Sequence, residues 1–293
     1  MNHPCYLCHK PTVLFMKKHG YRLYRCPVCK LTMTEFYQPY ALFVEQFYSK
    51  GYFTGDPRCS AFSGYEKDKQ CITRNLQQVL RKVKPYVNTN AKMLDAGCAM
   101  GFMVELARSY GYTAYGFDPS SYALSRATST MKQYLSQATI ETASYPKNSF
   151  DVITLTDIIE HVQDPIASMR KLRRFLKKNG LIVIATGDTQ SVAAKLLGKH
   201  WTFYIPPQHL FFLSKDNLTT MLNQTGFAPV TWFRVGKWLS LDYILHLAQS
   251  AGDFWWARYI HRVAKWLNIG KMPMYLPMQD NIVVIARKTN RTG

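Results

Sequence analysis

Two acidic residues frame a glycine-containing loop near the middle of the chain. Asp95 ends a short apolar run, and Gly97 and Gly101 follow it before a segment with helical spacing begins at Phe102. Such a loop can bring backbone N–H groups and a helix N-terminus close to a nucleotide-like ligand. Asp118 ends the next apolar run, where a carboxylate can accept hydrogen bonds from both hydroxyls of a ribose. The pattern predicts a nucleoside-binding site, with an ordinary strand-to-helix turn as the alternative.

The spacing of the glycines distinguishes between kinds of nucleotide. A dinucleotide-binding loop reads G-x-G-x-x-G, and here Ala99 and Phe102 occupy the second and third glycine positions. We expect the chain to tolerate Ala99 because its φ angle should remain negative. The loop therefore favours a nucleoside without a pyrophosphate over NAD.

A second group of chemically capable residues follows the apolar run 150–156. Asp157, Glu160 and His161 stand in the loop after this run, which in a parallel sheet lies at the same edge as the glycine loop. His161 can titrate near neutrality and is the first candidate for a general base, with a structural histidine bonded to nearby backbone as the alternative. We expect Asp157 to contact the cofactor or to cap the following turn.

A third candidate is His209, which lies in the aromatic, proline-containing segment 201–214. We expect this segment to form one wall of a substrate pocket, which makes His209 a candidate for a substrate-binding or catalytic role. Packing is the alternative. The segment that carries Tyr52, Phe53 and Tyr65 is expected either to pack between domains or to cover a ligand.

Four of the seven cysteines form two Cys-x-x-Cys pairs. They are Cys5, Cys8, Cys26 and Cys29. Two such pairs, separated by a hairpin-like stretch, can place four thiolates around one tetrahedral zinc ion. Because four thiolates leave no open position for water, we expect a structural zinc, with unpaired or redox-active thiols as the alternative. Cys59, Cys71 and Cys98 lack a partner at metal-binding spacing and are expected to be free, buried thiols.

From residue 91 onward the chain alternates apolar and amphipathic segments, which predicts an α/β domain with a parallel sheet. The expected strands are 92–95, 113–118, 150–156 and 181–185, followed by an antiparallel pair at 230–235 and 281–287. The expected helices are 72–83, 102–108, 165–178 with Asp164 as its N-cap, and one that Ser214 begins and that ends near Gly226. The pattern indicates a module at 1–40, a helical and aromatic connection at 41–90 and the main domain at 91–288.

Residues 237–275 form an insertion near the end of this main domain. We expect two helices in it, at 238–249 and 254–267, and then an ordered loop at 271–278 close to the pocket. The second helix interleaves large aromatic residues with basic ones. A substrate lid or dimer surface, plain packing, or a face that lies on an anionic membrane would each produce this pattern.

The stretch from Leu94 to Gly101 resembles motif I of class I S-adenosylmethionine-dependent methyltransferases, and Asp118 resembles the acidic end of their second strand. The segment 148–165 resembles the motif around their fourth strand. The cysteine module resembles the ribbon fused to a bacterial subset of this superfamily, many of whose members act on sugars or on glycan and natural-product intermediates. The resemblance implies a Rossmann-like seven-stranded sheet with an N-terminal zinc ribbon, and S-adenosyl-L-methionine and structural zinc as cofactors. The cofactor-binding residues it implies are Asp95, Gly97, Cys98, Gly101, Phe102, Asp118 and Asp157.

The resemblance also suggests where methyl transfer takes place. Glu160 and His161 resemble the Glu-His pair of zinc-ribbon sugar C-methyltransferases, which makes them candidate catalytic residues beside His209. Those enzymes place a tyrosine two residues before the glutamate, and this chain has Ile158 there. The segment 138–142 lacks an aspartate for the adenine amino group, which leaves Glu141 or backbone groups for that contact.

The net charge of +19, from 37 basic and 18 acidic residues, allows more than one kind of partner. Nucleic acid, an anionic lipid surface and an acidic substrate would all suit it, and so would a merely solvated surface. We expect a cytoplasmic enzyme that methylates a small molecule or a glycan- or lipid-linked intermediate, with possible peripheral contact with anionic membrane. The alternatives are an RNA methyltransferase that uses the ribbon and the basic surface, and a non-catalytic cofactor-binding protein of the same fold.

Overall fold

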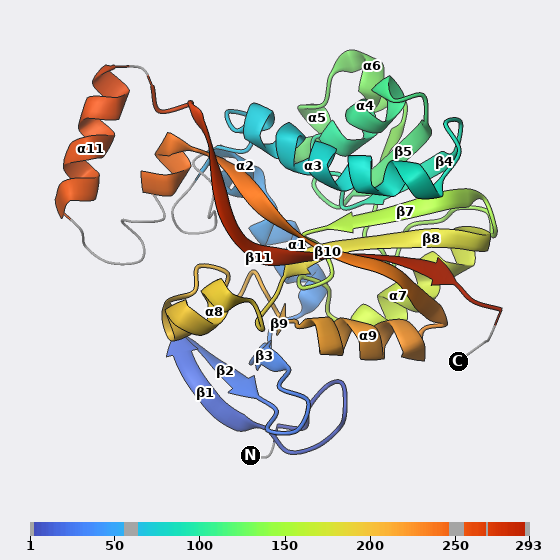
Figure 1. The fold of residues 1–293 in the computed structure, drawn as a ribbon, viewed down its shortest axis with the longest axis horizontal. Helices are drawn as coiled ribbons and strands as arrows, with labels where there is room; N and C mark the ends of the chain where they lie inside the picture. Colours follow the sequence, from blue (N-terminus) through green and yellow to red (C-terminus); the bar gives the residue numbers. More distant parts are fainter. Residues whose placement is uncertain (1–2, 56–63, 246–254, 268, 291–293) are drawn as a thin grey trace.

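A seven-stranded sheet runs through the middle of the computed structural model, which describes residues 3–55, 64–245, 255–267 and 269–290 (Figure 1). The strand order is β10-β11-β8-β7-β4-β5-β6. The strands are β4 (Lys92–Ala96), β5 (Thr113–Asp118), β6 (Leu135–Gln137), β7 (Phe150–Thr156), β8 (Leu176–Gly187), β10 (Phe227–Ser240) and β11 (Pro273–Lys288). Strands β6, β5, β4, β7 and β8 are parallel, while β11 and β10 are antiparallel to their neighbours. The predicted fold class, a Rossmann-like seven-stranded sheet, is therefore confirmed.

Helices cover both faces of this sheet (Figure 1). The helices on one face are α3 (Lys69–Val83), α4 (Phe102–Ser109), α5 (Ser121–Ser125) and α6 (Ser129–Lys132), and those on the other are α7 (Pro165–Phe175) and α9 (Lys215–Gln224). Successive residues of one strand supply the two cores, because their side chains point to opposite faces. Val183, for example, packs with Val79 and Leu80 of α3, whereas Ile184 packs with Leu172 of α7 and Leu218 of α9.

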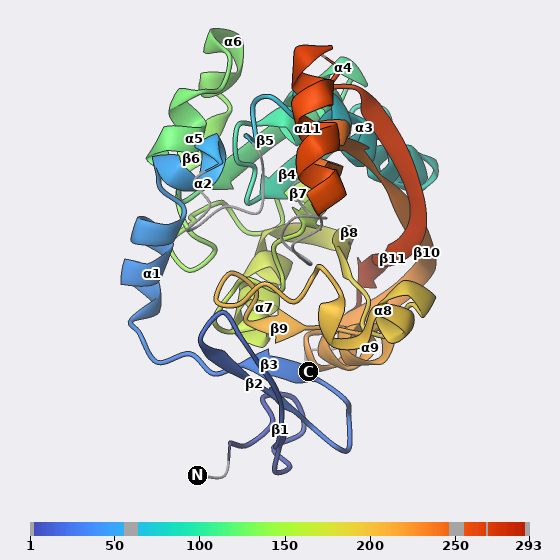
Figure 2. The same cartoon turned by 90° about the vertical axis from the view of Figure 1, so that its left-hand side faces the viewer.

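The N-terminal module forms a second, smaller sheet. It contains β1 (Val13–Lys18), β2 (Tyr21–Arg25) and β3 (Thr32–Thr34), and the β1–β2 hairpin confirms the expected one. Its fourth strand, β9 (Phe211–Phe212), comes from much later in the chain and pairs with β3 (Figure 2). The module is thus joined by backbone hydrogen bonds to the segment that carries His209, which the sequence pattern did not indicate.

The segment between the two sheets is short and helical. It contains α1 (Tyr40–Phe47) and α2 (Lys50–Thr54). Helix α3 follows, and a 3-10 turn (Lys84–Tyr86) that includes Pro85 comes directly after it. Phe43, Tyr52 and Phe53 of these helices are buried. Further along, α8 (Val192–Leu197) and a 3-10 turn (Gly198–His200) precede the aromatic loop.

Three expected elements differ in the structure. Helix α7 ends at Phe175, not at residue 178, because Leu176 already pairs with Phe150 of β7. Residues 238–240 belong to β10 and residues 273–278 to β11, where a helix and a loop were expected. Backbone pairing between these two stretches, such as Trp238 with Tyr275, outweighs the helical periodicity of their side chains. Residues 241–245 are helical, and 246–249 lie outside the described residues.

Helix α11 (Trp255–Trp266) stands at the far end of the long β10–β11 pair, away from the sheet (Figure 1). Tyr259, Ile260 and Trp266 are exposed, so these three side chains do not serve plain packing. None of the described helices is both long enough and apolar enough to span a membrane.

Candidate active site

A cavity of about 380 Å³ lies at the carboxyl ends of β4, β5 and β7. Three groups of residues form its wall. The glycine loop and the end of β5 contribute Asp95, Gly97, Cys98, Ala99, Phe102 and Asp118; the loop after β7 contributes Asp157, Ile158 and His161; and the opposite side contributes Tyr40, Tyr48, Tyr52, Phe203, Gln208, His209, Leu276 and Met278. One continuous space therefore joins the predicted nucleoside site to both candidate histidines.

The glycine loop follows a path that needs two glycines. Gly97 has φ +79°, and a Cβ there would lie 2.1 Å from the Ile158 side chain, so the close approach of the two loops excludes any larger residue. Gly101 has φ +78° and turns the chain into α4, although it is not part of the cavity wall. The expectation of a negative φ at Ala99 is wrong, because its φ is +47°. A left-handed alanine costs about 1–2 kcal/mol.

A hydrogen bond to Asp118 stabilises Ala99 in this conformation. Its Oδ2 accepts a hydrogen bond from the Ala99 N–H at 2.8 Å, and its Oδ1 accepts one from the Ser120 N–H at 2.9 Å. Each carboxylate oxygen retains a further lone pair, so a ribose contact is compatible with these bonds. Burial raises the pKa of Asp118 to about 6.

Two further amides of the loop are also used within the fold. The N–H groups of Gly97 and Cys98 donate to the carbonyl oxygen of Phe117, at 2.9 and 3.0 Å. These amides are therefore not free to donate to a ligand, although the sequence suggested that they would be. The loop still allows a ligand to lie close to its backbone.

Asp95 is buried beside the glycine loop. Burial raises the pKa of its carboxyl to about 7, although the Thr154 hydroxyl, which donates to Oδ1 at 2.6 Å, opposes that rise. A positively charged group in the cavity would favour the ionised form of this acid. Thr154 lies in the middle of an apolar strand, and no motif indicated that it would contact Asp95.

The structure brings His209, which the sequence proposed separately, together with the predicted pair Glu160 and His161. The imidazole rings of the two histidines lie 4.7 Å apart, nearly perpendicular to each other. The carboxyl group of Glu160 is completely buried, and among the described residues neither of its oxygens makes a hydrogen bond of ordinary geometry, although the Thr186 hydroxyl lies close enough to oppose a rise of its pKa. Burial raises the pKa of Glu160 to about 8, and the neighbouring Asp157 adds to this rise. Asp157 itself has φ +53° and lines the cavity.

Both histidines are held through the same ring nitrogen. Nδ1 of His161 lies 2.8 Å from the carbonyl oxygen of Gln208, and Nδ1 of His209 lies 2.8 Å from that of Phe203. The backbone bond of a structural histidine is thus present at His161, but it leaves Nε2 available. Burial lowers the pKa of His161, and burial together with His161 lowers the pKa of His209 further, so both rings are neutral at physiological pH.

The opposite wall contains Tyr48, which sequence reasoning did not assign to the site, beside Tyr52, which it proposed as a possible ligand cover. The Tyr48 hydroxyl lies 3.0 Å from Nδ1 of His161, and Gln208 donates from Nε2 to the Tyr52 hydroxyl at 3.0 Å. Tyr48 and Tyr52 come from the connecting segment, whose irregular pattern gave no indication that it reaches the candidate base. The connecting segment was expected either to pack or to cover a ligand. Tyr48 and Tyr52 fit both roles, because they are largely buried and also line the cavity.

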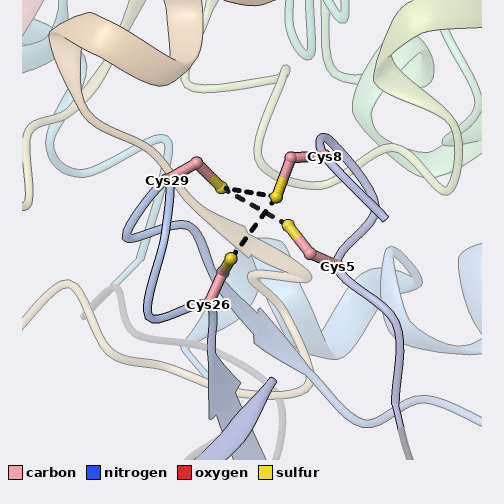
Figure 3. A group of neighbouring side chains, drawn as sticks. All are labelled: Cys5, Cys8, Cys26 and Cys29. Atoms are coloured by element: carbon pink, nitrogen blue, oxygen red, sulfur yellow. Dashed lines mark hydrogen bonds between the residues drawn. The ribbon is translucent and has the colours of Figure 1, made fainter. Parts of the chain in front are cut away.

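The four paired cysteines converge in the N-terminal module (Figure 3). Sulfur–sulfur distances are 3.4 Å for Cys5–Cys29, 3.4 Å for Cys8–Cys26 and 3.6 Å for Cys8–Cys29, and no disulfide links them. Four thiolates bound to one tetrahedral zinc ion would be separated by about 3.8 Å, given a Zn–S bond of about 2.3 Å. The donor set and its compactness therefore fit a zinc ion.

The three remaining cysteines do not join this group. Cys71 and Cys98 are free and buried, as expected, and Cys59 lies outside the described residues. Cys98 packs against Gly116 of β5, where a Cβ would lie 2.7 Å from the cysteine's own.

The parallel sheet with its antiparallel edge, and the glycine loop between β4 and α4, define a class I S-adenosylmethionine-dependent methyltransferase. Comparison with known families makes the assignment directly. Residues 66–231 match the family described as methyltransferase domain, and the chain belongs to that family. It is a methyltransferase enzyme, and S-adenosylmethionine is its cofactor.

Individual relatives agree with this assignment. The chain is 25% identical over 178 residues to the ubiquinone biosynthesis O-methyltransferase of Aliivibrio fischeri, a match that covers 53% of this chain and 76% of the relative. The corresponding enzyme of Bradyrhizobium diazoefficiens is 25% identical over 181 residues, covering 56% and 70%.

Solved structures share the fold. An S-adenosylmethionine-dependent methyltransferase from Archaeoglobus fulgidus superposes with a TM-score of 0.51 at 18% identity, covering 86% of this chain and all of the other. The YcgJ protein of Bacillus subtilis has a TM-score of 0.52 at 16% identity, covering 74% and 99%.

The buried carboxyls predict an unusual pH dependence of stability for the cofactor-free protein. The folded-state pKa values of Asp118, Asp95 and Glu160, about 6, 7 and 8, lie above those of the unfolded chain, so the folded state binds protons more tightly. Their stabilising contribution is complete below about pH 4 and is lost as the pH rises through 6 to 8. The lowered pKa values of His161 and His209 act in the opposite sense below about pH 6.5. We therefore expect the melting temperature to fall from pH 6.5 to pH 8.5, each unmatched proton changing stability by about 1.4 kcal/mol per pH unit.

Thermal melts by circular dichroism at constant ionic strength test this expectation. Glu160→Gln should flatten the upper part of the profile, whereas Glu45→Gln, on the exposed side of α1, should not. A melting temperature that rises over this pH range would contradict the assignment of raised pKa values.

Proposed function

We propose that the protein transfers the methyl group of S-adenosylmethionine to a hydroxyl oxygen of a small, largely apolar acceptor. The observation that carries the proposal is the continuous cavity that runs from Asp95 and Asp118 to His161 and His209. Its acceptor side is lined mainly by aromatic and aliphatic side chains, with Lys237 and Gln208 among the polar ones, and this lining suits an aromatic or prenyl-like molecule better than a sugar. The ubiquinone O-methyltransferase relatives support the same choice of oxygen and of acceptor class.

Within this cavity we assign the nucleoside half of the cofactor to the glycine loop. Asp118 accepts hydrogen bonds from the ribose hydroxyls, and Asp95 faces the ammonium group of the methionine part. The small residues Gly97 and Cys98 allow the ligand to approach the backbone, and Phe102 closes the side next to α4. Asp157 lies at the junction between cofactor and acceptor, because the loop after β7 borders both.

Methyl transfer from a sulfonium requires an in-line nucleophile about 3 Å from the methyl carbon and an acceptor for its proton. His161 is neutral, buried and on the cavity wall, and its Nδ1 bond to Gln208 leaves Nε2 to take the proton of the acceptor hydroxyl. We therefore propose His161 as the general base, with Glu160 and His209 completing the polar group around it.

A screen with labelled S-adenosylmethionine tests the acceptor class. Phenols, catechols and prenylated quinols are compared with nucleoside diphosphate sugars and with RNA, and the products are identified by mass spectrometry. Methyl ethers of the phenolic acceptors are expected. Methylation confined to carbon or nitrogen, or transfer to sugars or RNA alone, would overturn the proposal.

Asp118→Ala should lower the affinity for S-adenosylmethionine by at least about 100-fold in isothermal titration calorimetry. The variant loses the ribose contact and also the bonds that hold Ala99 in its left-handed conformation. Asp216→Ala, on the exposed surface of α9, is the matched control and should bind normally. An unchanged affinity in a folded Asp118→Ala protein would place the ribose elsewhere.

His161→Ala should reduce kcat by about 100-fold or more while the KM for S-adenosylmethionine changes less than about threefold, since a proton-transfer step is lost and the cofactor cradle is not. His200→Ala, an exposed histidine of the same chain, should retain kcat within about twofold. Steady-state kinetics with the acceptor found in the screen measure both. A variant with normal kcat would exclude His161 from the chemistry.

We also propose that residues 1–40 form a zinc ribbon in which Cys5, Cys8, Cys26 and Cys29 bind one structural zinc ion. Cys26→Ser should lower the zinc content by one equivalent per chain, measured by inductively coupled plasma mass spectrometry, and should destabilise the module. Cys71→Ala removes an unrelated buried thiol and should keep the zinc content of the unmodified protein. Equal zinc content in both variants would contradict binding by the four thiolates.

A further inference from the structure

The side chains of Glu160, His161 and His209 converge on one point. A carboxylate oxygen and one ring nitrogen from each histidine all lie within 4.8 Å of one another, and all three side chains are buried. Two loops supply them, the one after β7 and the one before β9. The group lies at the acceptor end of the cavity, because His161 and His209 are both part of its wall.

The hydrogen bonds of the two rings determine which nitrogen can bind a cation. A backbone carbonyl oxygen can only accept, so the 2.8 Å contacts to Gln208 and Phe203 place a hydrogen on Nδ1 of both His161 and His209. Each Nε2 then carries a lone pair. Histidines that bind metal ions are typically held in this way, with the other ring nitrogen donating to a backbone carbonyl.

The carboxylate of Glu160 completes a set of donors that lacks a cation. It is fully buried, and among the described residues neither of its oxygens makes a hydrogen bond of ordinary geometry, although the Thr186 hydroxyl lies nearby. Ionising this group without a partner would cost several kcal/mol, and a divalent ion beside it would offset that cost. Two imidazoles and one carboxylate are donors that divalent transition metals prefer, and they leave positions open for another ligand.

The backbone holds the two loops in place around this point. The carbonyl oxygen of Glu160 accepts hydrogen bonds from the N–H groups of Leu210 and Phe211, at 2.8 and 3.1 Å. The Thr34 hydroxyl donates to the carbonyl oxygen of His209 at 2.7 Å, and the Tyr40 hydroxyl donates to that of His161 at 3.1 Å. The positions of the donors are therefore set by the fold before any ion binds.

We propose that Glu160, His161 and His209 bind one divalent transition-metal ion whose open positions face the cavity and bind the acceptor oxygen. This inference rests on the proposed O-methylation and changes one role within it: His161 is a ligand, not the base. A metal-bound hydroxyl has a lower pKa, so its proton passes to solvent. The oxygen then forms a bond to the methyl carbon while the carbon–sulfur bond breaks and its electron pair stays on sulfur, giving S-adenosylhomocysteine.

Cobalt(II) is the probe, because its absorption reports its ligands. The full-length, zinc-loaded protein is treated briefly with a weak chelator, and Co²⁺ is titrated without S-adenosylmethionine or acceptor. We expect one equivalent to bind, with d–d absorption and without the thiolate-to-cobalt charge-transfer band that binding at the cysteines would give. Glu160→Gln and His209→Ala should each weaken this binding at least about 100-fold, and His200→Ala should not.

Circular dichroism verifies that the variants are folded, and having two of them guards against a single variant that fails to fold. The metal site would be overturned if cobalt bound only with a thiolate charge-transfer band, or did not bind saturably at all. Normal cobalt affinity in both folded variants would also overturn it. A full rate of methyl transfer in protein stripped of the second metal would also overturn it, and would leave the proposed O-methylation intact. A metal that binds as expected to a protein that methylates no hydroxyl would instead refute the proposed function.

Discussion

The carbonyl oxygen of Glu160 is the point on which the acceptor side of this protein depends. By accepting hydrogen bonds from two successive amides, Leu210 and Phe211, it ties the loop after β7 to the strand β9. His161 is the next residue after Glu160, and His209 immediately precedes Leu210, so this one group brings the two histidines together. Neither loop has regular secondary structure at this point that would otherwise place them. The proximity of the two rings thus follows from the backbone and not from their own contacts.

The same strand links the cysteine module to the site. Strand β9 is the edge strand of the small sheet and pairs with β3, while Asn217 of α9 donates to the carbonyl oxygen of Cys29 at 2.8 Å. Arg25 of β2 reaches the hydroxyl of Tyr204 in the aromatic loop, at 2.9 Å. A module that would be a separate domain by sequence therefore forms part of the support for His209. A metal ion that folds this module would affect catalysis by positioning His209, although none of the four paired cysteines lines the cavity.

Much of this architecture could be predicted from the sequence, because parallel strands and their helices have strong local patterns. The strands at 113–118 and 150–156 and the cap at Asp164 correspond to the expectations. The candidate residues of the glycine loop and of the loop after β7 could also be named, since each follows directly after a strand. What could not be predicted depends on pairing between distant segments: the β3–β9 contact, the extension of β10 and β11, and the approach of Tyr48 to His161. Alternating patterns report the periodicity of a segment but not its partner.

Ala99 shows why the sequence could not give the local conformation of the glycine loop either. Intrinsic preference predicts a left-handed φ at glycine and a negative φ at alanine. At Ala99 one hydrogen bond from its N–H to the buried carboxylate of Asp118 overrides that preference. The charge of Asp118 is itself unfavourable where it lies, since burial raises its pKa. Two amide donors partly offset that cost, and a bound ribose would offset more of it. The protein's own groups thus hold the loop in a left-handed conformation at Ala99 and leave part of the cost of burying Asp118 without compensation.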